Sequence, residues 1–337
     1  MMRIILLLLL SISLNAQTFT NPLLPAGADP WSIYKDGYYY YTHTLGNRIA
    51  IWKTKNLAEL KTAKSKTIWT PPANTLYSKD VWAPEIHFIN NKWYVYFAAD
   101  DGKNENHRMY VLENTSKDPM EGKWELKGKI SDPSNKWAID GSVFNYKGTM
   151  YMIWSGWETD KNGEQDIYIA KLKNAWTVDG ERVRISKPTY DWETHGDLND
   201  VNNPPHVNVN EGPQALQNSG KLFIIFSASG CWTEYYSLGM LMFEGSDPMD
   251  ASAWKKHEKP LFVASPENEV YAPGHNSFFK SPDGKEDWIL YHANSAPGQG
   301  CGGKRSPRAQ KFTWGVDGAP VFGTPLKTGR SISAPGE

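Results

Sequence analysis

A pattern that recurs five times constrains the fold of this chain more than any other feature of its sequence. Each copy opens with an ionisable residue, enters a short apolar run, meets a polar turn and continues into an aromatic run. Two β-rich runs around a Gly- or Asn-containing turn are typical of a β-hairpin. The copies begin 56, 55, 71 and 64 residues apart, at Asp29, Glu85, Asp140, Glu211 and His275.

A third β-rich run follows in most copies, for example at 47–54 and 108–113, and a weaker fourth often comes next. Three or four strands in each unit at this period match the blades of a β-propeller. The 15 Trp, 17 Tyr and 12 Phe also favour strands over helices. We predict an all-β, single-domain, five-bladed propeller. A β-sandwich is the alternative, because short strands at regular spacing are found there too.

The first 16 residues have the pattern of a secretory signal. Arg3 precedes an apolar run at 4–10, and the small and mixed residues 11–16 allow cleavage after Ala16. We therefore expect a signal peptide at 1–16, the propeller catalytic domain at 17–337, and export to the periplasm or beyond the cell. The alternative is a cytosolic protein with an apolar start. No later run is long enough to span a membrane, so no membrane partner is expected.

The remaining bulk features are the cysteines and the net charge. Cys231 and Cys301 have no metal-ligand spacing, and in an oxidising compartment we expect them to form a disulfide, with two free thiols as the alternative. The chain has 36 basic and 37 acidic residues and a net charge of −1. This balance of basic and acidic residues argues against a nucleic-acid partner and fits a neutral polysaccharide as the substrate.

The sequence does not indicate an oligomeric state.

The five opening residues should meet in space. The first strand of every propeller blade lines the central channel, so the repeat places all five at one end of it. Crowded carboxyl groups in a low dielectric raise one another's pKa and cost stability. Such a cluster therefore indicates acid–base chemistry or a bound cation. The alternative is that some of these acids pair locally, Glu85 in particular.

Five tetrapeptides around these residues, in this order and spacing, resemble glycoside hydrolase family 43. The resemblance covers essentially the whole chain after residue 16 and implies a five-bladed propeller that inverts the anomeric centre. The motifs are Ala28-Asp29-Pro30-Trp31, Trp82-Ala83-Pro84-Glu85, Ile139-Asp140-Gly141-Ser142, Asn210-Glu211-Gly212-Pro213 and Gly274-His275-Asn276-Ser277.

The resemblance implies catalytic roles for three of these acids. Asp29 would be the general base, Glu211 the general acid, and Asp140 the residue that tunes the pKa of Glu211. Inverting hydrolysis needs a carboxylic acid to protonate the leaving oxygen and a carboxylate to activate water, with the two carboxyl groups about 6.5–9.5 Å apart.

The resemblance also implies binding residues. His275 would lie beside a structural Ca²⁺ ion, Glu85 and Trp82 near the substrate, and Arg308 against the substrate and Asp140. For Arg308 the alternative is an ordinary surface arginine; Arg305 lies three residues before it.

Tryptophans offer flat faces to sugars, and four of them lie beside the inner-strand motifs: Trp31, Trp82, Trp154 and Trp157. We expect about three sugar contacts, with Trp82 first and Trp31 and Trp154 as further candidates; most other tryptophans should pack between blades.

The resemblance favours an exo-acting α-L-arabinofuranosidase acting on arabinose-containing polysaccharides or oligosaccharides. A β-xylosidase, with a xylose-containing substrate, is the next alternative, followed by a galactofuranosidase and an endo-arabinanase. A non-catalytic carbohydrate-binding propeller would need none of the three acids in this pattern.

Overall fold

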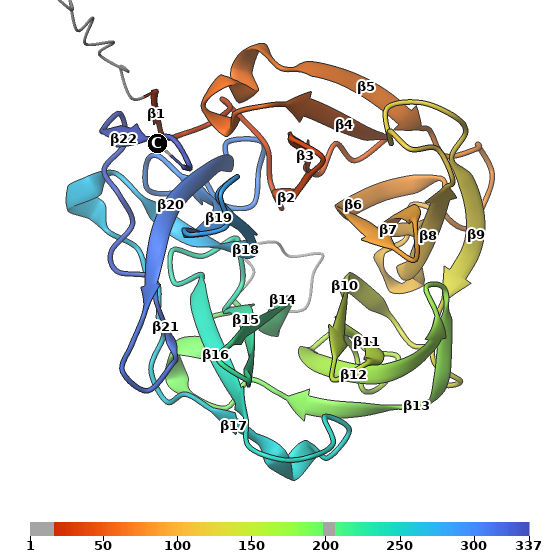
Figure 1. Cartoon of the computed structure of the whole chain (residues 1–337). Helices are drawn as coiled ribbons and strands as arrows, with labels where there is room; N and C mark the ends of the chain where they lie inside the picture. The colour runs from red at the N-terminus through yellow and green to blue at the C-terminus, as the bar shows by residue number, and fades with distance from the viewer. Residues whose placement is uncertain (1–16, 198–205, 337) are drawn as a thin grey trace, which may run out of the picture.

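The structure is a computed structural model that describes residues 17–197 and 206–336. The predicted signal peptide lies outside the described residues. The strands form blades arranged in a ring around a central channel (Figure 1). The prediction of an all-β, five-bladed propeller is confirmed. No helix of the described residues is long and apolar enough to cross a membrane.

Each blade is a meander of four antiparallel strands, numbered outward from the channel. Blade 1 contains β2 (Trp31–Lys35), β3 (Tyr38–Thr42), β4 (Ile49–Thr54) and β5 (Lys64–Trp69). Blade 2 contains β6 (Lys79–Ile89), β7 (Lys92–Asp100), β8 (Arg108–Asn114) and β9 (Glu125–Ile130). Blade 3 contains β10 (Ala138–Tyr146), β11 (Thr149–Gly156), β12 (Glu164–Asn174) and β13 (Thr177–Ser186).

The last two blades follow the same plan. Blade 4 contains β14 (Asn208–Asn218), β15 (Lys221–Ala228), β16 (Ser237–Phe243) and β17 (Trp254–Lys256). Blade 5 contains β18 (Tyr271–Lys280), β19 (Asp287–Asn294), β20 (Ser306–Trp314) and β21 (Pro320–Val321). A short parallel pairing of β12 with β14 joins blades 3 and 4 into one sheet. The short 3₁₀ helices, including η1 (Leu57–Thr62), lie in the connections.

The turns between the first two strands explain why the repeat folds as hairpins. In four blades, two consecutive turn residues have positive φ: Asp36-Gly37, Asn90-Asn91, Lys147-Gly148 and Ser219-Gly220. This conformation matches the twist of the flanking strands, and Gly and Asn adopt it most readily. The polar turns of the repeat are therefore the hairpin turns.

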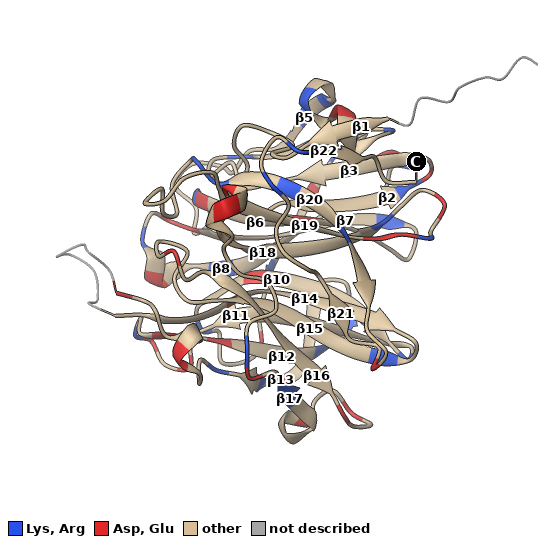
Figure 2. Ribbon diagram, turned by 90° about the vertical axis from the view of Figure 1, so that its left-hand side faces the viewer, with Lys and Arg blue, Asp and Glu red and all other residues tan. Residues whose placement is uncertain are grey.

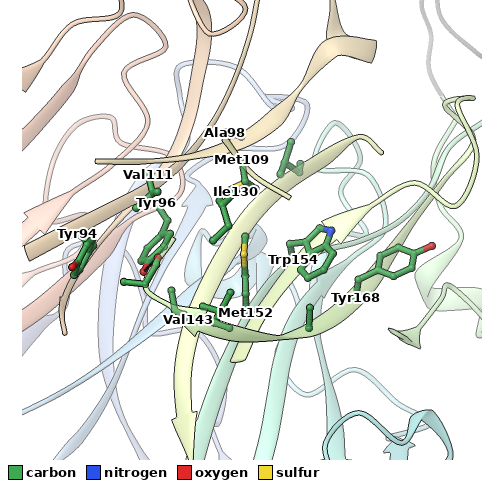
Figure 3. Packing of buried hydrophobic residues seen from close by; sticks show 14 of the residues in the cluster. Tyr94, Tyr96, Ala98, Met109, Val111, Ile130, Val143, Met152, Trp154 and Tyr168 are labelled. Carbon is green, nitrogen blue, oxygen red and sulfur yellow. Dashed lines mark hydrogen bonds between the residues drawn. The ribbon is translucent and has the colours of Figure 1, made fainter. Parts of the chain in front are cut away.

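Blade-to-blade packing forms the core. The described buried apolar residues fall into five clusters, each shared by two neighbouring blades. In β7, Tyr94 and Tyr96 face blade 3 (Figure 3), whereas Trp93 and Val95 face blade 1. Both faces of this strand are buried, so residues 93–99 are a continuous run of aromatic and aliphatic residues instead of alternating with charged ones.

A separate two-stranded sheet lies at the seam between blades 5 and 1. It pairs β1 (Thr18–Thr20) with β22 (Ser331–Ser333), which brings the two ends of the described chain together (Figures 1 and 2). Phe19 of β1 is buried in the cluster shared by the two blades, 6.1 Å from Trp288 between ring centroids. This sheet therefore supports the closure of the ring.

We expect Phe19→Ala to destabilise the protein by about 3 kcal/mol, because it removes a buried ring and leaves a cavity at the closing seam. Urea unfolding monitored by tryptophan fluorescence measures this loss as a lower midpoint. Val316→Ala is the control, since Val316 is fully exposed. A midpoint equal to that of the wild type would mean that the Phe19 side chain does not stabilise the seam.

Candidate active site

Irregular backbone at the inner strands aims the opening residues into the channel. The pairing of the first two strands breaks register at Ile139/Ser142 in blade 3 and at Glu211/Gln214 in blade 4. Asp29, Asp140 and His275 themselves have φ of 57°, 56° and 49°. Bulges and left-handed non-glycine residues concentrate at functional sites, where they redirect side chains.

A cavity of about 430 Å³ opens at this end of the channel, a size suited to a small ligand. It combines carboxyl groups, an imidazole and a guanidinium with three indole rings. Its lining residues are Asp29, Thr44, Trp82, Asn104, Trp137, Ile139, Asp140, Asn162, Gln165, Val207, Glu211, Cys231, Trp232, His275, Cys301 and Arg305. The structure therefore brings four of the five opening residues into one cavity.

Asp29 is held as a carboxylate. Its Oδ2 accepts a hydrogen bond from Thr44 Oγ1 at 2.6 Å, and its Oδ1 lies 3.3 Å from His275 Nδ1 and 3.4 Å from Arg305 Nη1. Burial opposes ionisation, but the charges of His275 and Arg305 outweigh it and hold the pKa of Asp29 well below its usual range. Its backbone N–H donates to His292 Nδ1 at 3.0 Å.

Glu211 is in the opposite state. Burial raises the pKa of this carboxyl, and the Asp29 charge raises it further. Tyr236 donates its hydroxyl to Glu211 Oε1 at 2.7 Å, which lowers the pKa in part because it stabilises the charged form. Glu211 therefore favours holding a proton, while Asp29 remains ionised.

Asp140 lies next to Glu211. Its Oδ2 accepts a hydrogen bond from the backbone N–H of Gly212 at 3.0 Å. Burial, together with the charges of Glu211 and Asp29, raises the pKa of Asp140 to about 7, against the lowering effect of His275. Asp140 and Glu211 therefore compete for protons as a coupled pair.

His275 is the cation among these acids. Burial disfavours its charge, but Asp29, Asp140 and Glu211 together raise the pKa of its imidazole. Its backbone N–H donates to Ser227 Oγ at 2.7 Å, which fixes the strand at this point. Residue 212 is a glycine with φ of 55°, and a Cβ there would lie 3.3 Å from the His275 ring. The close approach of blades 4 and 5 needs this glycine.

Glu85 lies outside this cavity. Counted back from the positive-φ hairpin turn, the residue of blade 2 that matches Asp29 and Asp140 is Ala83, not Glu85 as the sequence suggested. Glu85 is buried deeper in the channel, where its Oε2 is 2.9 Å from His87 Nε2 and its Oε1 accepts a hydrogen bond from Gln214. Ala83 has a positive φ, as Asp29 and Asp140 do, whereas Glu85 does not, so the Glu85 side chain is directed differently. The structure thus favours local pairing of Glu85 over a substrate contact.

Of the three tryptophans predicted to bind substrate, the structure places only Trp82 in the cavity. Trp31 donates its Nε1–H to the carbonyl of Ile86 at 2.8 Å, between blades 1 and 2. Trp154 is buried between blades 2 and 3 and stacks on Tyr168 at 5.9 Å (Figure 3). For Trp31 and Trp154, packing between blades replaces the expected sugar contact.

The arginine that lines the cavity is Arg305, not Arg308 as expected. Arg308 is fully buried within blade 5, and its guanidinium donates to Thr328 Oγ1 at 2.9 Å and to Ser295 Oγ at 2.7 Å. Its place in the middle strand β20 directs it into the blade. Arg305 lies before that strand and lines the cavity.

The predicted disulfide is present. Cys231 and Cys301, with Cα atoms 5.2 Å apart, join a loop of blade 4 to a loop of blade 5, and both line the cavity.

Two tryptophans that the sequence did not predict as site residues, Trp232 and Trp137, also line the cavity. The sequence gives only a weak signal for either of them: Trp232 directly follows Cys231, and Trp137 lies three residues before Asp140.

The described residues do not by themselves supply a ligand set for the predicted calcium ion. Ca²⁺ takes about six to eight oxygen ligands. Within residues 17–197 and 206–336, no group of three His, Cys, Asp or Glu side chains is arranged to hold a metal ion. The deeper cavity beside His275 has no room for a water molecule that could complete a coordination shell. Calcium therefore stays a prediction of the resemblance, and no step below involves it.

Glycoside hydrolysis requires a pair of carboxyl groups, one that is ionised and one that holds a proton, and this cavity contains such a pair in Asp29 and Glu211. The sequence profile of Glycosyl hydrolases family 43 matches residues 19–320. The chain therefore belongs to glycoside hydrolase family 43, as its motifs predicted.

Relatives found by sequence and by structure agree with this assignment. An extracellular exo-α-(1→5)-L-arabinofuranosidase of Streptomyces avermitilis is 40% identical over 322 residues, which are 93% of this chain and 64% of the relative. An enzyme of the same description from Streptomyces chartreusis is 35% identical over 82% of both chains. An α-L-arabinofuranosidase from Lactobacillus brevis is 36% identical in sequence. Its crystal structure superposes with a TM-score of 0.84 over 93% of this chain and 98% of that one.

We expect Tyr236→Phe to raise the pKa of Glu211, because it removes a hydrogen bond that stabilises the carboxylate. The ¹³C chemical shift of the labelled Glu211 carboxyl, followed through a pH titration, measures the change. Tyr235→Phe is the control, since the neighbouring Tyr235 is exposed. An unchanged or lower pKa in the Tyr236 variant would contradict the role of this hydroxyl.

Proposed function

We propose that this protein is an exo-acting, inverting α-L-arabinofuranosidase that releases arabinose from arabinose-containing polysaccharides or oligosaccharides. One observation carries the proposal: Asp29 and Glu211 share a cavity, but their pKa values are moved in opposite directions. Environments that separate two carboxyl pKa values define a base and an acid. The substrate class is supported by the three arabinofuranosidases to which the chain is similar.

The proposed reaction is a single displacement. Glu211 gives its proton to the glycosidic oxygen as the bond between that oxygen and the anomeric carbon breaks. Asp29 takes a proton from a water molecule as the water oxygen bonds to the anomeric carbon from the opposite face. The products are arabinose with inverted configuration and the shortened alcohol, and Glu211 ends ionised while Asp29 ends protonated. Transfer of a proton back through solvent restores the starting state.

The neighbouring groups support this assignment. The charges of His275 and Arg305 keep Asp29 ionised, ready to accept a proton. Asp140 lies against Gly212, beside the acid, and in its ionised form its negative charge would favour the protonated form of Glu211. Trp82, Trp137 and Trp232 give the cavity flat apolar surfaces of the kind on which sugar rings pack.

We also propose that the protein is exported. The apolar run at 4–10 and the extracellular location named for the two Streptomyces relatives support export. The indicated cleavage after Ala16 would leave Gln17, which directly precedes β1, as the first residue of the mature protein.

A panel of nitrophenyl glycosides tests the proposed activity. The α-L-arabinofuranoside should be hydrolysed, and the β-xyloside and β-galactofuranoside much less. Release of single arabinose units from linear arabino-oligosaccharides would establish exo action, and ¹H NMR of the first product anomer would establish inversion. Preference for the xyloside would indicate a β-xylosidase instead. Binding of oligosaccharides without hydrolysis of any substrate would indicate a carbohydrate-binding propeller.

We expect Asp29→Ala and Glu211→Ala each to reduce kcat about 10²–10⁴-fold on arabinobiose, since each removes a proton-transfer group. The two variants should differ on a dinitrophenyl arabinofuranoside, whose leaving group needs little protonation. Glu211→Ala should recover much of its activity there, and Asp29→Ala should not. Circular dichroism checks that both variants fold. Equal recovery by the two variants would contradict the assignment of acid and base.

We expect kcat/KM to have a bell-shaped pH profile. Asp29 acts when ionised, so activity is lost as pH falls through its lowered pKa; Glu211 acts when protonated, so activity is lost as pH rises through its raised pKa. Asp140→Asn removes a negative charge beside Glu211, so the alkaline limb should move to lower pH. Initial rates on the arabinofuranoside across the pH range measure this. An alkaline limb that stays in place would exclude Asp140 as the tuning group.

A further inference from the structure

His107 lies just outside the cavity and has no part in the mechanism above. It ends η2 (Asn104–Asn106) and directly precedes β8, and its side chain is fully buried. Its ring stacks on the indole of Trp82, with centroids 4.0 Å apart and planes 26° apart. Trp82 lines the cavity and is only partly buried, so the surface that packs on it helps to determine its orientation.

Oxygen atoms lie next to both nitrogens of the His107 ring. Nε2 is 3.2 Å from the carbonyl oxygen of Asp80, and Nδ1 is 3.3 Å from that of Asn104. Asp100 Oδ2 also lies 3.1 Å from Nδ1. Burial lowers the pKa of His107, so the ring is neutral and donates its single N–H to one of these sides. That hydrogen bond and the complete burial of the side chain limit the rotation of the ring. The imidazole is therefore a rigid support for the indole that stacks on it.

The segment 104–107 also contacts the indole of Trp137, which lines the same cavity. The Asn104 carbonyl accepts a hydrogen bond from Trp137 Nε1 at 2.7 Å, and the His107 carbonyl accepts one from the backbone N–H of Ala138 at 3.3 Å. Ala138 begins β10, the strand that carries Asp140. His107 thus connects the Trp82 surface in blade 2 to the Trp137 surface at the start of blade 3.

We propose that His107 is a positioning residue that orients Trp82 against the substrate and so determines how tightly the cavity holds the sugar. The proposal rests on the proposed function, because it names the support of a substrate-binding surface of that same site. His107 acts through Trp82 and does not touch the reacting atoms, so its removal should weaken binding and leave the chemical step intact.

A double-mutant cycle of His107→Ala and Trp82→Ala on arabinobiose tests this, because residues that act through one another have non-additive effects. His107→Ala should raise KM about tenfold and change kcat by less than about twofold. In the Trp82→Ala background, the same His107 substitution should change KM by less than about twofold. His107→Phe keeps a flat ring but loses both nitrogen contacts, and its effect should fall between those of the wild type and His107→Ala.

Controls separate this role from general stability. His257→Ala removes an exposed histidine in blade 4 and should leave both constants unchanged. Thermal unfolding is measured for every variant; if His107→Ala does not fold, the cycle is run with His107→Phe. An equal KM change in both Trp82 backgrounds, or an equal fall in kcat and kcat/KM, would overturn the proposal.

The outcome for the wild type separates this proposal from the proposed function. A wild type that hydrolyses arabinobiose, with a His107 variant that is indistinguishable from it, would leave the proposed function standing and reject the positioning role. Binding of arabinobiose to the wild type is measured by titration calorimetry. A wild type that neither hydrolyses nor binds arabinobiose would reject both the proposed function and the positioning role.

Discussion

Packing of each blade against the next is the interaction on which the rest of this structure depends. A four-stranded meander of this kind buries its apolar faces only when a neighbour covers each of them. The five shared clusters meet that need around the whole ring, and the β1–β22 sheet covers the last seam. Closure of the ring then brings two residues that are far apart in sequence together, with Asp29 Oδ1 3.3 Å from His275 Nδ1.

The site uses that closure to place unlike charges in one buried cavity. Three carboxyl groups without a cation would all be driven toward the neutral form by burial and mutual repulsion. His275 and Arg305 break this symmetry because both lower the pKa of Asp29, while Glu211 and Asp140 stay raised. One carboxyl is thus kept as a base and another as an acid by neighbours from different blades.

The aromatic residues serve both the ring and the cavity. Trp93 and Trp154 are buried between blades, where a large flat ring covers much apolar area. Trp82, Trp137 and Trp232 line the cavity instead. The rigid contacts of His107 show how a blade can hold one of these indoles in place without contributing to the chemistry.

The sequence by itself determined the five-fold repeat, the hairpin turns, the family and four of the five opening residues that meet in the cavity. These follow from local patterns, since turn chemistry and apolar runs act over a few residues. Only the tertiary structure decided that Glu85 pairs with Gln214 and His87, and that Arg305 faces the cavity while Arg308 does not. A side chain's direction depends on bulges and on neighbours from other blades, and those contacts exist only once the ring has closed.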